Sequence, residues 1–203
     1  MAAVGNSHLD LAWLWPMQET HRKTARTFAA QLRLLEQYPE YRYIQSQPAA
    51  YEMCREHYPE LYERIRSAVR SGRWIAEGAM YVEPDTNIPS GEALVRQLVF
   101  GKRFYRDELG IDSQVLWLPD TFGYSAVLPQ LLASCGVRYL VTQKFSGAIT
   151  KATRFPIITS IGRAWTAARS CPFCLPITPT GPIRRNYAAF GKSGCKSGIW
   201  KIS

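Results

Sequence analysis

The chain has 203 residues, of which 46% are hydrophobic and 20% are charged, so it is long enough to bury one substantial core. Its net charge of +9 would suit a nucleic-acid or membrane partner, but residues 1–146 carry 16 basic and 16 acidic residues. The excess positive charge therefore lies in residues 147–203. Basic and aromatic residues form no regular pattern there, and the segment has no recognisable fold that would present them to a nucleic acid. With no secretory signal and no apolar run near about 18 residues, we expect a cytoplasmic protein with no nucleic-acid or membrane partner.

The first predicted strand, over residues 2–5, leads into His8 and Asp10. These residues are two apart, and an extended backbone projects them to the same side. An imidazole nitrogen and a carboxylate oxygen placed in this way can share a divalent cation such as zinc. A structural histidine beside a helix-capping aspartate would leave the same pattern. Trp13 and Trp15 follow at once, and indole rings beside polar groups suit the floor of a sugar-binding site.

Helices and strands alternate along the rest of residues 1–146. We predict helices over 17–37, 48–71, Ser90 to Gly110 and 126–134, with strands over 41–46, 74–77, 115–118 and 137–141. Pro59 should kink or split the second helix, and His21 and His57 read as structural helix residues. This order predicts an α/β fold with a parallel sheet and right-handed crossovers, and periodicity leaves open whether the sheet closes.

Two loops carry further acidic residues at the ends of predicted strands. Glu83 and Asp85 lie in the polar loop 78–87, where solvated turn residues are the simplest interpretation. Asp120 follows the apolar strand 115–118 and so has the same topological position as His8 and Asp10. Catalytic groups of alternating strand–helix folds gather at the carboxyl ends of strands. Asp120 is therefore a candidate for the same site.

Four motifs give the chain a specific resemblance to a known family. They are GNSHLDLAWLW at 5–15, EPDTNIPSGE at 83–92, WLPDTFGYS at 117–125 and YLVTQKFS at 139–146. In this order they resemble the catalytic domain of family 38 glycoside hydrolases, the zinc-dependent retaining α-mannosidases, most closely the cytosolic and bacterial type. The resemblance implies a partial (β/α) barrel, truncated after about five strands.

The resemblance also implies roles for individual residues. Asp120 would be the nucleophile and a zinc ligand, and His8 and Asp10 would be zinc ligands. Trp13 and Phe122 would pack on the mannose ring, and Asp85 would accept a sugar hydroxyl, as in a site for mannose-containing glycans. The family's general acid and its fourth zinc ligand, a histidine, lie beyond the matched segment. We therefore expect an α-mannosidase fragment that cleaves terminal α-mannosyl linkages only when completed, and that is inactive on its own.

Residues 147–203 differ from the family pattern, and we expect a frameshifted or disordered tail there. This tail contains no acidic residue, which is improbable at an ordinary acidic content of about a tenth. Its Cys171-Pro-Phe-Cys174 spacing has no second pair to complete a metal site. Two other functions remain open, a zinc-dependent deacetylase-like barrel and a non-enzymatic basic remnant. The motif around Asp120 argues against the first, and the confinement of the charge to the tail argues against the second. The oligomeric state is left open.

Overall fold

The computed structural model describes residues 4–142 and 198–201. The chain divides into two compact units, which are described separately. The first unit comprises Ala2–Val82 and Val99–Ser113, and the second comprises Glu83–Leu98 with the described residues from Gln114 onward. Helix α4 (Gly91–Leu109) contributes its first turns to the second unit and the rest to the first.

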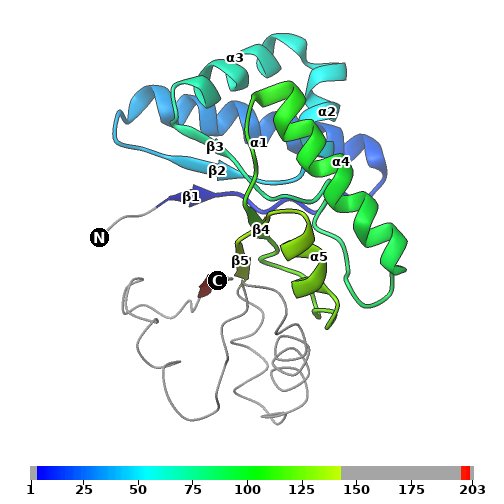
Figure 1. Ribbon diagram of the computed structural model, residues 1–203. Coiled ribbons are helices and arrows are strands. Elements are labelled where there is room, and N and C mark those ends of the chain that lie inside the picture. Colours follow the sequence, from blue (N-terminus) through cyan, green and yellow to red (C-terminus); the bar gives the residue numbers. More distant parts are fainter. Residues whose placement is uncertain (1–3, 143–197, 202–203) are drawn as a thin grey trace. The chain divides into compact units, whose positions relative to one another are not determined.

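The first unit is built on a parallel sheet of three strands in the order β1-β2-β3. Its elements are β1 (Gly5–Asn6), α1 (Met17–Gln37), β2 (Tyr43–Gln45), α2 (Pro48–His57), α3 (Pro59–Arg70) and β3 (Trp74–Ala76). In register, Gly5 pairs with Tyr43, and Tyr43 pairs with Trp74. Helices α1, α2 and α3 lie together over one face of this sheet (Figure 1). The parallel pairing predicted from the strand–helix alternation is confirmed for these three strands.

An aromatic cluster forms the core between this sheet and its helices. Phe28 of α1 meets the edge of Trp74, with ring centroids 5.4 Å apart, and Tyr43 packs on the same indole at 4.7 Å. The indole Nε1 of Trp74 donates a hydrogen bond of 2.8 Å to the hydroxyl of Tyr51. Because this buried polar atom has a partner, the core contains a tryptophan without the cost of an unsatisfied donor.

The predicted break in the second helix occurs at the expected residue. Helix α2 ends at His57 and α3 begins at Pro59, with Tyr58 between them at φ −142°. The proline ring disfavours helical backbone for the residue before it, and the proline itself suits the first position of a new helix. The prediction of a split at Pro59 is therefore confirmed.

Helix α4 approaches the loop after β3 closely through a glycine. A Cβ atom on Gly101 would lie 2.2 Å from the carbonyl oxygen of Ala79. Only glycine allows two backbones to approach at this distance. At the start of the same helix the hydroxyl of Ser90 accepts a hydrogen bond of 3.2 Å from the amide of Ala93 and so caps the helix.

The second unit contains a separate sheet in the order β4-β5-β6. Strands β4 (Val115–Trp117) and β5 (Tyr139–Thr142) are parallel and flank α5 (Leu128–Ser134) in sequence. Strand β6 (Gly198–Lys201) comes from the acid-free tail and pairs antiparallel with β5. Parallel strands alternating with helices confirm the α/β class. Within residues 4–142 and 198–201 neither sheet closes, so the partial barrel stays a prediction. No helix of the described part is both long and apolar enough to cross a membrane.

Candidate active site

The first unit brings His8 and Asp10 together just beyond the carboxyl end of β1. The Nε2 atom of His8 lies 3.2 Å from Oδ1 of Asp10. The two side chains are 29% and 39% exposed, so both can reach a ligand from solvent. Their donor types, an imidazole nitrogen and a carboxylate oxygen, are those that zinc accepts. The predicted convergence of these two residues is therefore present in the structure.

Two buried side chains hold the backbone on either side of Asp10. Gln47 follows β2, and its Nε2 donates a hydrogen bond of 2.8 Å to the carbonyl of Leu9. Thr20 of α1 donates a hydrogen bond of 2.8 Å to the carbonyl of Leu11. The backbone of Gln47 has φ 65°, a left-handed conformation that is rare for a residue with a side chain. Such backbone strain is found where surrounding structure requires it, often near functional sites.

The sequence alone did not single out Gln47 and Thr20 as supports of the candidate site. Gln47 could have been noticed because it lies beyond the carboxyl end of β2, as His8 does beyond that of β1. Thr20 carries no comparable signal, since a threonine on the buried face of an amphipathic helix reads as ordinary packing.

Asp120 lies in the second unit, three residues beyond the end of β4. The hydroxyl of Tyr124 donates a hydrogen bond of 3.1 Å to the carbonyl of Leu118, which ties the following loop back to the strand. Burial raises the pKa of Tyr124, and the negative charges of Asp120 and Glu83 raise it further. The phenol therefore stays protonated at neutral pH and remains a donor to the loop that carries Asp120.

A buried threonine joins the Asp120 loop to the loop that carries Asp85. The hydroxyl of Thr86 donates a hydrogen bond of 2.9 Å to the carbonyl of Gly123 and accepts one of 2.9 Å from the amide of Ser125. Thr86 is 1% exposed, so solvent does not compete for these bonds. Sequence reasoning missed this residue as well, because nothing in a Pro-Asp-Thr turn shows which distant backbone the hydroxyl will meet.

Asp85 has a structural role of its own in this loop. Its Oδ1 accepts hydrogen bonds from the amides of Asn87 and Ile88, at 2.7 and 2.8 Å. This is the turn that the simplest sequence interpretation predicts for an aspartate in such a loop. The contact with a sugar hydroxyl that the resemblance implies for Asp85 stays a prediction.

Each unit also exposes one aromatic ring that the resemblance assigns to the sugar. Trp13 is 53% exposed in the first unit, and Phe122 is 75% exposed in the second. Trp15 is less available, because its Nε1 donates to Thr20 and the Lys23 ammonium lies 4.5 Å from the centre of its ring. Exposed aromatic faces beside polar groups remain suited to stacking against a sugar ring.

Comparisons with known proteins agree with the family indicated by the four sequence motifs. The N-terminal domain of glycosyl hydrolases family 38 matches residues 1–160. Human alpha-mannosidase 2C1 is 46% identical over 144 residues, which are 71% of this chain and 14% of that protein. Alpha-mannosidase G of Dictyostelium discoideum is 46% identical over the same length, which covers 71% of this chain and 13% of that protein.

A solved structure extends the likeness to the fold. The crystal structure of an alpha-mannosidase from Enterococcus faecalis V583 matches with a TM-score of 0.61 at 27% identity, covering 66% of this chain and 15% of that one. The chain thus spans only about a seventh of the length of the curated relatives that it matches. It belongs to glycosyl hydrolase family 38 and corresponds to an N-terminal part of the family's α-mannosidases.

Proposed function

We propose that this chain supplies three of the zinc ligands and the nucleophile of a retaining α-mannosidase acting on mannose-containing glycans. The observation that carries the proposal is the His8–Asp10 pair at the end of β1, in a family-38 chain whose Asp120 follows β4. The deacetylase-like alternative requires no aspartyl nucleophile, and the shown family makes a glycosidase the better interpretation. By resemblance to the cytosolic family type, we also propose that the protein acts in the cytoplasm.

The donors present in the first unit fit a zinc ion. Two donor atoms bound to one tetrahedral zinc ion lie about 3.4 Å apart, since each bond is about 2.0–2.2 Å long. The observed distance from Nε2 of His8 to Oδ1 of Asp10 is 3.2 Å, close to this value. Asp120 would be a further ligand in the proposal, which rests there on its motif and its strand-end position. When bound, the metal would supply a Lewis acid for the sugar hydroxyls and so orient the ring.

Asp120 would perform the first chemical step together with a general acid, which the resemblance places beyond the matched segment. A carboxylate oxygen of Asp120 attacks the anomeric carbon as the bond to the leaving-group oxygen breaks, and a general acid gives that oxygen its proton. Water, deprotonated by the same acid–base group, then cleaves the ester to Asp120. Two inversions at one carbon give net retention. Trp13 and Phe122 would position the mannose ring through their exposed faces. Asp85 would accept a hydrogen bond from a hydroxyl of the sugar.

The proposal can be tested in a chimera in which residues 1–146 replace the matching segment of human alpha-mannosidase 2C1. The chimera should hydrolyse an aryl α-mannoside with retention of configuration, followed by NMR, and chelation should abolish its activity. Asp120→Asn should remove nearly all turnover, whereas Asp112→Asn, a change at a side chain that is 72% exposed, should not. An inverted product, or full turnover in the Asp120→Asn variant, would disprove the mechanism.

A further inference from the structure

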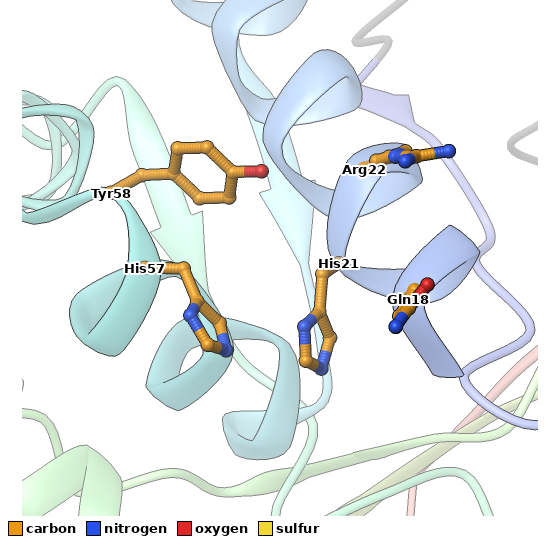
Figure 2. Close-up of a pocket in the computed structure, with 5 residues that line it drawn as sticks. All are labelled: Gln18, His21, Arg22, His57 and Tyr58. Carbon is orange, nitrogen blue, oxygen red and sulfur yellow. The ribbon is translucent and has the colours of Figure 1, made fainter. Parts of the chain in front are cut away.

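Two histidines outside the family motifs face each other between helices α1 and α2. The imidazole centroids of His21 and His57 are 4.4 Å apart, and their planes are tilted by 31°. Figure 2 shows the two rings side by side in a pocket whose other lining residues are Gln18, Arg22 and Tyr58. His21 is half-buried on α1, and His57 is exposed at the last residue of α2. The pair is therefore accessible from solvent, and its members come from two different helices.

The spacing of the rings fits two imidazoles bound to one metal ion. With a metal–nitrogen bond of about 2.0 Å, centroids 4.4 Å apart subtend about 90° at a shared ion. A tetrahedral angle would instead require a centroid separation of about 5.2 Å. The right angle is the one between neighbouring ligands in the square-planar and octahedral complexes of Cu²⁺ and Ni²⁺. In such a site each ring would direct one nitrogen toward that shared position.

The charges around the pair are compatible with a cation. An imidazole binds a metal ion in its neutral form. Arg22 is 74% exposed, and its guanidinium lies 3.8 Å from the carboxylate of Glu19, which offsets part of its charge. Gln18 and Tyr58 supply side-chain oxygens at the pocket wall, and water can occupy the remaining coordination positions.

We propose that His21 and His57 form a second metal site, which takes a late first-row divalent ion with right-angle coordination, Ni²⁺ or Cu²⁺. The site would link α1 to α2 on the helical layer of the first unit. It uses none of His8, Asp10 or Asp120, so it is independent of the proposed mannosidase function. A bound ion also stabilises the folded chain over the unfolded one, because the two ligands converge only in the fold.

The test is a calorimetric titration of the reduced 203-residue chain with Ni²⁺ at neutral pH. The sequence contains three histidines in all, so three single variants separate the two sites. His21→Gln and His57→Gln should each weaken one equivalent of Ni²⁺ by about tenfold or more, a loss of about 1.4 kcal/mol or more in binding free energy. His8→Gln, the matched control, should leave this equivalent unchanged. The cysteines are the same in every variant and contribute a constant background.

NMR of the wild-type chain gives a second readout that does not depend on how the variants fold. Substoichiometric Ni²⁺ should broaden the side-chain resonances of His21 and His57 together, and before that of His8. Absence of Ni²⁺ binding, or equal affinity in the wild type and His21→Gln, would overturn the proposal. Loss of the same equivalent in His8→Gln would also overturn it, by assigning the ion to the candidate active site.

Discussion

Replacement of Thr86 by valine removes a buried hydroxyl that joins the Asp85 loop to the Asp120 loop. Valine has the shape of threonine, so the packing volume is kept while two hydrogen bonds are lost, one to the carbonyl of Gly123 and one from the amide of Ser125. Each such bond contributes about 0.5–1.5 kcal/mol net, and a buried group left without a partner costs about 1–3 kcal/mol. We therefore expect Thr86→Val to destabilise the chain by about 2–3 kcal/mol.

Thr86→Ser is the matched control for this prediction. Serine keeps the hydroxyl and loses one buried methyl group, which costs about 1 kcal/mol. Urea denaturation measures both variants, and hydrogen exchange at the Ser125 amide reports on the loop itself. Exchange there should be faster in Thr86→Val than in Thr86→Ser. If valine is tolerated as well as serine, or if Ser125 stays equally protected, the hydroxyl does not hold the loop and this reasoning is refuted.

Three further predictions concern the first unit and the chain as a whole. Gln47→Ala should weaken zinc binding at the His8–Asp10 pair by about 10–100-fold, because the side-chain amide of Gln47 fixes the Leu9 carbonyl between these two residues. Competition with a chelating dye measures the affinity, and an unchanged affinity would contradict this role. Burial raises the pKa of Cys54 from 9.0 to about 12, and burial together with Glu52 raises that of Tyr81 from 10.0 to about 12. Above about pH 9 the folded state then binds more protons than the unfolded state, so the free energy of unfolding should fall between pH 9 and pH 12. A free energy of unfolding that stays constant over this pH range would count against these pKa shifts. The purified chain should show no hydrolysis of aryl α-mannosides, because the family's general acid lies beyond the matched segment and no acidic residue follows Asp120 to replace it. General acid assistance is worth about 10²–10⁴ in rate. Turnover that Asp120→Asn abolishes would refute this expectation.

Local chemistry was enough to predict the helices and strands and the pairing of His8 with Asp10. Apolar periodicity and punctuation by proline and glycine predicted the helices and strands of residues 4–142, including the division of α2 from α3 at Pro59. The convergence of His8 and Asp10 was predictable because residues two apart on extended backbone point the same way. These features depend on neighbours within one turn or one strand, so the sequence alone contains them.

The remaining features depend on partners far apart in the chain. Gln47 meets Leu9 across 38 positions, and Thr86 meets Ser125 across 39. Periodicity shows that such a residue is buried, but not which backbone group it will meet. For the same reason the sequence did not predict the separate three-stranded sheets, the antiparallel pairing of β6 with β5, or the contact between His21 and His57. Tertiary structure decided these features, because a hydrogen bond or ring contact depends on which segments pack together and not on the residues beside it in the chain.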